Sequence, residues 1–560
     1  MTSYRNNYLR VLKMSGVALA AFAAACAHNG QQTSNLAVDE VVEVAQKDAK
    51  IESPVAQTAY GKVRGVVEDG VSVFKGIPYG GDTSERRFKR ALPPESWEGV
   101  RDALVFADTT PQVESSDTAA FKSWVPDPLP AQSENMLGLN VWTPAADGEK
   151  RPVMVWLHGG GFVTGSGSSN VYDGVRLANR GDVVVVSINH RLNAMGYLYL
   201  AELGGEEYAD SGNVGNLDMI MALEWVRDNI ANFGGDPENV LIFGESGGGR
   251  KVSTLLAMPE AEGLIDRAIV QSGSHLKVRT PEAATNDTKA YLKLLGVEPD
   301  NLEALKDLPT QAFVDALTAP DFTSGRMINF GPVLDGKNIL EHPFDGKPAA
   351  PSKSVPMLVG SNDDELSLWL IADRAIFTMD YDGIAQRLGA FFPEEDWEAV
   401  VAGYREIYPD EKPYELLYTI ASDGRYGENA VRQVEAKARQ AAQEDGVAPA
   451  WLYHFEWNTP IANGLLKSPH ALELAFVFDN LAKSESFVGD PVGPQPLADI
   501  VADAWIAFAR NGDPNTDALP EWPQVTEDNL SAMRLKLEPE LDEIFFDAED
   551  KVLDALPSRQ

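Results

Sequence analysis

The sequence predicts an α/β fold, with a large, mostly parallel central sheet flanked by helices and gathered into a single domain. Two observations support this prediction. Short apolar runs that lead into glycine-rich loops recur along the chain, as expected for buried strands that carry a site at their ends. A stretch that can form a helix follows one of these loops at once, which is typical of a strand–turn–helix unit.

Chain length and composition are compatible with one large folded domain. The 560 residues exceed the usual domain size, but α/β enzymes can reach this length in one domain. Hydrophobic residues make up 44% of the chain, with 11 Trp and 22 Phe, which is enough for a large buried core. Neither an internal repeat nor a Pro- or Ser-rich linker divides the interior, so we expect residues 56–560 to form one folded domain.

Residues 1–25 predict an export signal. Three basic residues precede the apolar run "VALAAFAAA", which ends at "AAAC" and is too short to span a bilayer. The pattern resembles a bacterial lipoprotein signal, in which Cys26 would become the lipidated first residue. Ala23 stands where that pattern prefers Leu or Val, so ordinary cleavage in the Ala-rich stretch is the alternative. Either way we expect an exported bacterial protein, periplasmic or anchored to the membrane as a lipoprotein.

Residues 26–55 are polar and lack a core period, so they predict a tether between the export signal and the folded domain. Cys26 is the one cysteine of the chain, which excludes an internal disulfide. Asp and Glu outnumber Lys and Arg by 84 to 47, which gives a formal charge of −37. A nucleic acid would be repelled, so no nucleic-acid partner is expected. A solvated acidic surface explains this charge, and steering of cationic substrates is the alternative. The oligomeric state is left open.

The stretch "LIFGESGGGR" at 241–250 predicts a nucleophile. A phosphate-binding Walker loop would need Lys and then Ser or Thr after Gly249, but Arg250 follows instead. The pattern G-x-S-x-G fits, with Ser246 on a tight turn between the strand "NVLIFG" and a helix that begins near "RKVSTLLAM". Asp236 and Pro237 mark the turn expected before that strand. The glycines allow the sharp turn and the close approach of a substrate.

A serine nucleophile needs a base and an acid that orients it. On the α/β-hydrolase fold the acid and then the histidine follow the serine in the chain. His454 lies in an alternating aromatic strand, whereas His470 lies on a loop before an apolar element and is the better base. The acid is expected after the strand "MLVG", where composition alone does not choose among Asp363, Asp364 and Glu365.

A second glycine loop predicts an oxyanion hole. In "PVMVWLHGGGFVTG", a strand from Val153 to Leu157 leads into three consecutive glycines. The backbone N–H groups of Gly160 and Gly161, with that of Gly247 beside the nucleophile, would stabilise the negative charge of a tetrahedral intermediate.

With these motifs located, the chain resembles the type-B carboxylesterase family, which includes cholinesterases and bacterial para-nitrobenzyl esterases. The likeness extends from "GKVRG" at residue 61 to "WP" at 522–523 and includes "FKGIPY", "NHRLNAMGY" and "WIAFARNGDPN". This resemblance implies the triad Ser246, Glu365 and His470, because "GSNDDEL" and "HALELAFVF" match the family's acid and histidine motifs. The first serine of "QSGS", Ser272, would be a supporting residue.

The resemblance implies hydrolysis of carboxylic esters through an acyl-enzyme, with no metal or other cofactor and a small-molecule ester as substrate. Around the site, Phe162 is expected to form a wall and Glu245 to favour a cationic alcohol or accept an internal hydrogen bond. Trp124 corresponds to the choline-binding tryptophan of cholinesterases or covers apolar surface. "ENML" replaces the family's "EDCL", so the usual first disulfide loop is lost. The alternatives are a lipase, thioesterase, amidase or cholinesterase-like activity, or a non-catalytic binding member of the fold.

Overall fold

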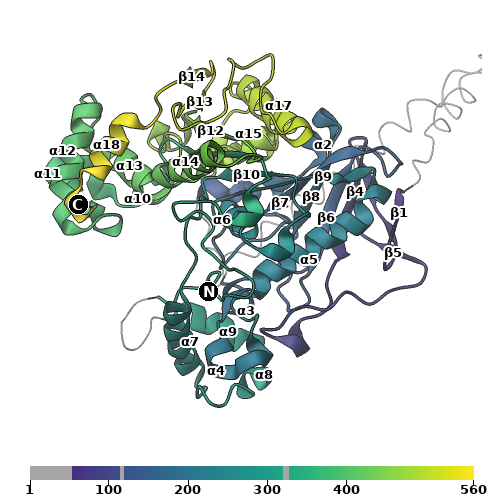
Figure 1. Cartoon of the computed structure of the whole chain (residues 1–560). Coiled ribbons are helices and arrows are strands. Elements are labelled where there is room, and N and C mark those ends of the chain that lie inside the picture. Colours follow the sequence, from purple (N-terminus) through teal and green to yellow (C-terminus); the bar gives the residue numbers. More distant parts are fainter. Residues whose placement is uncertain (1–52, 114–118, 320–326, 560) are drawn as a thin grey trace, which may run out of the picture. The chain divides into compact units, whose positions relative to one another are not determined.

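A mixed sheet of eleven strands forms the centre of the computed structural model, which describes residues 53–113, 119–319 and 327–559 (Figure 1). The strands of this sheet and of a smaller one are β1 (Val55–Thr58), β2 (Gly61–Arg64), β3 (Val66–Glu68), β4 (Val71–Pro78), β5 (Val100–Asp102), β6 (Gly138–Thr143), β7 (Arg151–Leu157), β8 (Val184–Ile188), β9 (Gly235–Glu245), β10 (Arg267–Gln271), β11 (Met357–Asn362), β12 (Ala450–Phe455), β13 (Ala532–Leu535) and β14 (Glu540–Asp542). The large sheet has the order β14-β13-β12-β11-β10-β9-β7-β8-β6-β4-β3, and β1, β2 and β5 form a small separate sheet.

The predicted mostly parallel sheet is confirmed. In the run β8-β7-β9-β10-β11-β12-β13, each strand is parallel to the next one. Antiparallel pairs occur only towards the two edges of this sheet, between β3, β4, β6 and β8 and between β13 and β14. Ser53–Gln560 form a compact unit, whose first strand begins at Val55, next to the predicted domain start at 56.

Helices connect the strands. They are α2 (Val175–Gly181), α3 (Asn193–Tyr197), α4 (Ala201–Gly204), α5 (Val214–Asn229), α6 (Gly247–Leu255), α7 (Pro281–Leu295), α8 (Ala304–Asp307), α9 (Thr310–Leu317), α10 (Ser367–Leu370), α11 (Tyr381–Ala385), α12 (Trp397–Ile407), α13 (Pro413–Ser422), α14 (Glu428–Gln443), α15 (Leu474–Val477), α16 (Glu485–Val488), α17 (Gln495–Asn511) and α18 (Asp547–Asp554). Within the described residues, no helix is both long and apolar enough to cross a membrane.

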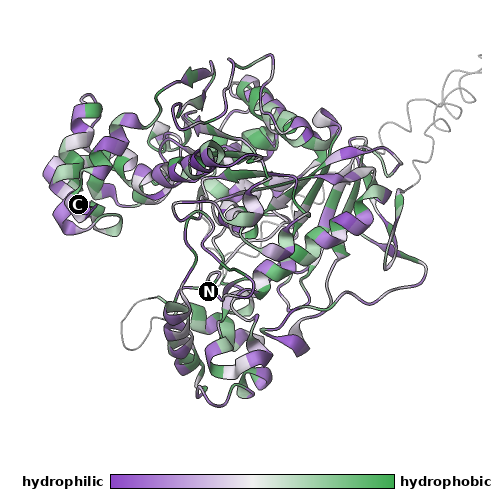
Figure 2. Ribbon diagram, viewed as in Figure 1, coloured by the Kyte–Doolittle hydropathy of each residue, from purple (hydrophilic) through white to green (hydrophobic). Residues whose placement is uncertain are grey.

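Both faces of the sheet are covered, as the continuous apolar runs predict. Successive side chains of a strand point to opposite faces, so β7 places Val153, Val155 and Leu157 in one core and Met154 and Trp156 in the other. The first core includes residues of α5, α6 and α14, and the second includes residues of α2, α15 and α17. In Figure 2 the central strands are mainly green, whereas the surrounding helices carry both colours.

One prediction about the strand before the nucleophile is wrong. Asp236 and Pro237 do not precede β9 as a turn but belong to the strand, which begins at Gly235. The pairing with β7 passes from Gly235 directly to Val240, so the residues between them have no partner on that strand. A proline lacks the N–H that a regular ladder needs, and this irregular part of the strand accommodates it.

Candidate active site

Ser246 lies on the turn between β9 and α6, at the edge of the sheet where the parallel strands end. Its backbone has φ 56° and ψ −118°, a conformation that residues other than glycine rarely adopt. The N–H of Ser246 donates to the carbonyl of Gln271 at the end of β10, with N···O 2.9 Å, which helps to hold the turn. The serine is partly exposed although its neighbours on both sides are buried, as a nucleophile that must meet a substrate requires.

The glycines around Ser246 are required by close backbone contact. A Cβ on Gly248 would lie 1.9 Å from the carbonyl oxygen of Leu157, the last residue of β7. A Cβ on Gly247 would lie 2.2 Å from the carbonyl oxygen of Gly161. Helix α6 therefore starts directly against the end of β7 and the loop that follows it. Glycines disfavour a helix by about 1 kcal/mol each, so this first turn depends on its packing.

The structure separates the three candidate acids that composition could not rank. Glu365 accepts a hydrogen bond from His470, with Oε2 and Nδ1 2.5 Å apart. Asp363 instead contacts His454, with Oδ1 and Nε2 3.3 Å apart. Asp364 accepts a hydrogen bond from the backbone N–H of Ser468. Each candidate acid thus has its own partner, and the predicted acid and base are the pair that is brought together.

The Glu365–His470 pair is rigidly held. Glu365 is fully buried, and its Oε1 accepts from the backbone N–H of Asn362 at 2.9 Å. The N–H of His470 donates to the carbonyl of Glu365, which ties the two segments together a second time. The imidazole ring packs against Trp369 and Tyr426, with ring centroids 5.0 and 4.9 Å away. These contacts fix the orientation of the ring.

A second carboxylate faces the other nitrogen of the imidazole. Glu245 Oε1 lies 3.0 Å from His470 Nε2, and both residues are buried. Burial alone would lower the pKa of His470, but Glu245 and Glu365 outweigh it and hold this pKa well above the ordinary 6.5. Burial raises the pKa of Glu245. Because Ser246 directly follows Glu245, the turn brings the serine and the imidazole to the same edge of the sheet. The structure places Glu245 beside the imidazole of His470, and both interpretations of Glu245 stay predictions.

Glu473 belongs to the same buried group, although the sequence analysis gave it no role. Its carboxylate accepts hydrogen bonds from Asn362 at 2.8 Å and from Gln271 at 3.1 Å. Burial, together with the charges of Glu245 and Glu365, raises the pKa of Glu473 to about 8. No local pattern in the sequence marked this role, because Ala471 has φ 68° and α15 begins only at Leu474, so the three-residue spacing from His470 is not a helical one.

The predicted oxyanion loop follows β7 and is shaped by glycine. Gly160 and Gly161 have φ of 85° and 64°. The carbonyl of Gly160 accepts from the N–H of Thr164 at 3.0 Å, which closes the loop. Within the described residues, the N–H groups of Gly160 and Gly161 donate to no backbone carbonyl. The side chain of Lys251 on α6 donates to the carbonyl of His158 at 2.7 Å, which ties the start of the loop to α6.

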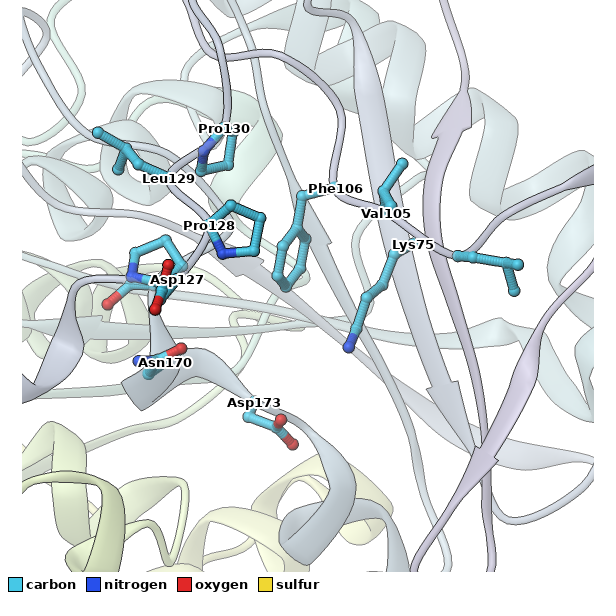
Figure 3. Close-up of a pocket in the computed structure, with 12 residues that line it drawn as sticks. Lys75, Val105, Phe106, Asp127, Pro128, Leu129, Pro130, Asn170 and Asp173 are labelled. Carbon is cyan, nitrogen blue, oxygen red and sulfur yellow. The ribbon is translucent and has the colours of Figure 1, made fainter. Parts of the chain in front are cut away.

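Two cavities are lined by residues of the oxyanion loop or of the segment after it, and a third shares lining residues with the second of them. Gly161, Phe162 and Arg250 are among the residues that line a cavity of about 250 Å³. Trp124 lines another, of about 440 Å³, with residues that follow the oxyanion loop. Figure 3 shows a third, of about 350 Å³, around Phe106 and Pro128, whose lining includes no predicted catalytic residue.

The other predicted site residues are placed as follows. Phe162 is buried against Tyr197 and His275, with ring centroids 5.1 and 5.7 Å away, and forms part of a cavity wall. Trp124 stacks on Phe121 and donates its indole N–H to Ser484 at 2.9 Å. Ser272 follows β10, and its buried hydroxyl has no partner within the described residues. Cys26 lies outside the described residues.

The mostly parallel sheet, the strained serine turn after a central strand, and the acid–histidine pair after later strands define an α/β-hydrolase. The sequence model of the carboxylesterase family matches residues 52–552. The chain belongs to this family, and it is a serine hydrolase of carboxylic esters.

Individual relatives agree with this assignment. The chain is 36% identical over 494 residues to the para-nitrobenzyl esterase of Bacillus subtilis, with 86% of this chain and 95% of that protein covered. It is 32% identical over 494 residues to the phenmedipham hydrolase of Pseudarthrobacter oxydans, with the same coverage. Among solved structures, a carboxylesterase of Geobacillus stearothermophilus has a TM-score of 0.76 at 38% identity, covering 89% of this chain and 99% of that one.

Proposed function

We propose that the enzyme hydrolyses esters in two steps, with Ser246 as nucleophile, His470 as base and Glu365 as the acid that orients the base. The observation that carries this proposal is the buried hydrogen bond of 2.5 Å between Glu365 and His470, at the sheet edge where Ser246 turns outward. Ser246 Oγ attacks the ester carbonyl while Nε2 of His470 takes its proton. Glu365 stabilises the imidazolium that forms and fixes its tautomer.

The glycine loop stabilises the tetrahedral intermediate. The N–H groups of Gly160, Gly161 and Gly247 donate to the oxyanion, and the backbone contact between Gly161 and Gly247 holds two of these donors together. His470 then gives its proton to the leaving alcohol, and the C–O bond breaks. Water, activated by the same imidazole, cleaves the acyl-serine and releases the acid. Every step uses groups of the chain and water.

The test is hydrolysis of 4-nitrophenyl esters from C2 to C16 by the wild type, Ser246→Ala and Glu365→Gln. Ser246→Ala should lower kcat by about 10⁴- to 10⁶-fold, because the members of a triad act as a unit. Glu365→Gln keeps the shape but loses the correct tautomer, so we expect a loss of about 10⁴-fold. Turnover by folded Ser246→Ala at the wild-type rate would refute the assignment of the nucleophile.

The same set of substrates separates this proposal from the alternatives that use the same triad. An esterase prefers soluble short acyl chains, whereas a lipase is activated by emulsions of long-chain esters. Acetylthiocholine tests a cholinesterase-like preference, because Trp124 lines a cavity beyond the oxyanion loop. Thioesters and anilides test the other acyl chemistries. A non-catalytic binding member of the fold would turn over none of them.

We also propose that the chain is exported and anchored to a membrane through a lipid on Cys26. The support is the sequence pattern alone: an apolar run after basic residues, ending in small residues before the one cysteine of the chain. The test is metabolic labelling with palmitate in a bacterial host, comparing the wild type with Cys26→Ser. A lipoprotein takes up label and stays with membranes, and Cys26→Ser does neither. An unlabelled wild type in the periplasm would instead support ordinary cleavage.

A further inference from the structure

Arg250 places a cation one helical turn from the nucleophile. It is the fourth residue after Ser246, and its N–H donates to the carbonyl of Ser246 at 3.0 Å. Four residues of helix correspond to about 6 Å along the axis. The side chain of Arg250 lines the cavity of about 250 Å³ that Gly161 and Phe162 also line. The cavity therefore joins a predicted oxyanion donor to a guanidinium.

The guanidinium of Arg250 has no hydrogen-bond or ion-pair partner within the described part of the chain, although the residue is partly buried. Its surroundings also lower its pKa, chiefly because burial removes water from the charge. Arg279, another residue of the same cavity wall, differs. It forms an ion pair with Asp287 at 2.5 Å and donates to the carbonyl of Asn329 at 2.7 Å. A charge that is taken out of water is costly unless it is paired.

The other titratable groups near this cavity do not neutralise Arg250. No carboxylate lines the cavity among the described residues. The nearby carboxylates of Glu245 and Glu365 contact the imidazole of His470 instead. His275 lines the cavity, but burial and the charge of Arg250 lower its pKa to about 3, so it is neutral. The cavity is thus a positively charged recess with an aromatic wall.

We propose that Arg250 binds a carboxylate at the far end of the acyl group, so that half-esters of dicarboxylic acids are substrates of this enzyme. This inference rests on the proposed function, because the cavity is an acyl site only if Gly161 holds the oxyanion. Guanidinium pairs with carboxylate through two parallel hydrogen bonds, which fixes both position and orientation. The aromatic wall of the cavity contacts the apolar chain between the ester and the carboxylate.

The charge of the whole chain makes such a preference informative. With a formal charge of −37, the long-range field of the protein repels an anionic ester. A faster reaction with an anionic ester than with its neutral counterpart must therefore come from a local positive group. Salt screens interactions between exposed charges beyond about 8 to 10 Å and affects a partly buried pair much less.

The experiment compares mono-4-nitrophenyl adipate with methyl 4-nitrophenyl adipate, which has the same chain but no charge. In both reactions the aryl ester C–O bond breaks and 4-nitrophenolate leaves, and water then releases adipate or monomethyl adipate from Ser246. We expect the wild type to have a higher kcat/KM for the half-ester. Arg250→Met should lower this value about 10- to 100-fold, mostly through KM, and leave the methyl ester within about threefold. Arg250→Lys keeps the positive charge but loses the paired N–H donors of the guanidinium, so its kcat/KM for the half-ester should lie between those of the wild type and Arg250→Met.

Arg227→Met is the matched control, because Arg227 lies exposed near the end of α5 and its loss changes the net charge equally. It should leave both esters unaffected. A wild type that prefers the methyl ester, or equal losses on both esters in Arg250→Met, would overturn the inference while neutral-ester turnover still supports the proposed function. No turnover of either ester beyond the level of Ser246→Ala would instead overturn the proposed function itself.

Discussion

Replacing Gly248 with alanine should disrupt the contact between the nucleophile helix and the oxyanion loop. The new Cβ would lie 1.9 Å from the carbonyl oxygen of Leu157, whereas ordinary van der Waals contact begins at 3.4 Å, so one backbone must move by about 1.5 Å. Leu157 leads directly into the loop that contains Gly160 and Gly161, and the movement is transmitted to them. A misplacement of about 1 Å costs roughly 10²-fold in rate, and loss of one oxyanion donor costs about 10² to 10³. We therefore expect kcat to fall by at least about 10²-fold.

Two further glycines turn this prediction into a graded series. A Cβ on Gly249 would lie 2.8 Å from Cα of Gly273, which requires a movement of only about 0.6 Å, so Gly249→Ala should lower kcat by about tenfold or less. A Cβ on Gly493 would meet nothing within 4 Å. Gly493→Ala should leave kcat unchanged and leave the thermal midpoint unchanged or slightly raised, because alanine reduces the freedom of the unfolded chain.

The assay is kcat on a short-chain 4-nitrophenyl ester, with the concentration of active sites titrated by an organophosphate and the thermal midpoint measured in parallel. Titration separates a slower site from a smaller folded fraction. If Gly248→Ala keeps kcat per active site within threefold of the wild type, the backbone contact with Leu157 does not position the oxyanion loop. Equal loss in all three variants would likewise refute the reasoning from Cβ distances.

Two other predictions concern the buried charges of the site. The imidazole of His470 accepts a proton only when it is neutral, and its pKa is held above 6.5. The value of kcat/KM should therefore rise with pH, with the midpoint of this rise above pH 6.5. Glu245→Gln removes one of the carboxylates that raise the pKa of His470, so it should move this midpoint to lower pH. An unmoved midpoint would show that Glu245 does not act on the base. Lys251→Met leaves the carbonyl of His158 without its donor, so it should lower kcat more than Lys437→Met, which removes a similar buried contact to a backbone carbonyl elsewhere. Equal kcat in these two variants would assign Lys251 a role in stability alone.

The parallel strands and their glycine loops were predictable because local sequence specifies them. Strands buried on both faces read as continuous apolar runs, and β7 and β11 each extend the predicted strand by only two residues. The glycines of these loops are informative because glycine loses more conformational entropy on folding than any other residue, so a cluster of glycines indicates a turn or a close contact. The start of β9 was predicted wrongly, since Pro237 is accommodated by an irregular pairing with β7 that only the neighbouring strand reveals.

The choice of acid and the buried charges were not readable from the residues alone. Asp363 and Glu365 are two residues apart and chemically alike, and only the fold sends one to His454 and the other to His470. The resemblance to a family supplied that choice. Arg250 was visible only as a reason to exclude a phosphate loop. That Arg250 lacks a partner among the described residues depends on which carboxylates the fold brings near it.

The dispersed origin of the site has a consequence for how activity emerges during folding. The loops that carry the oxyanion donors and the nucleophile follow β7 and β9, which are neighbours in the sheet and lie in the first half of the chain. The imidazole of His470 lies 105 residues after Glu365, the carboxylate that orients it. Contacts between distant segments form slowly, because the entropy cost of closing a long loop comes before the favourable free energy of the contacts. The nucleophile and its oxyanion donors can thus be assembled while the base is still missing. Ester turnover therefore reports that the segment carrying His470 has joined the rest of the site, and not only that the turn of the nucleophile has formed.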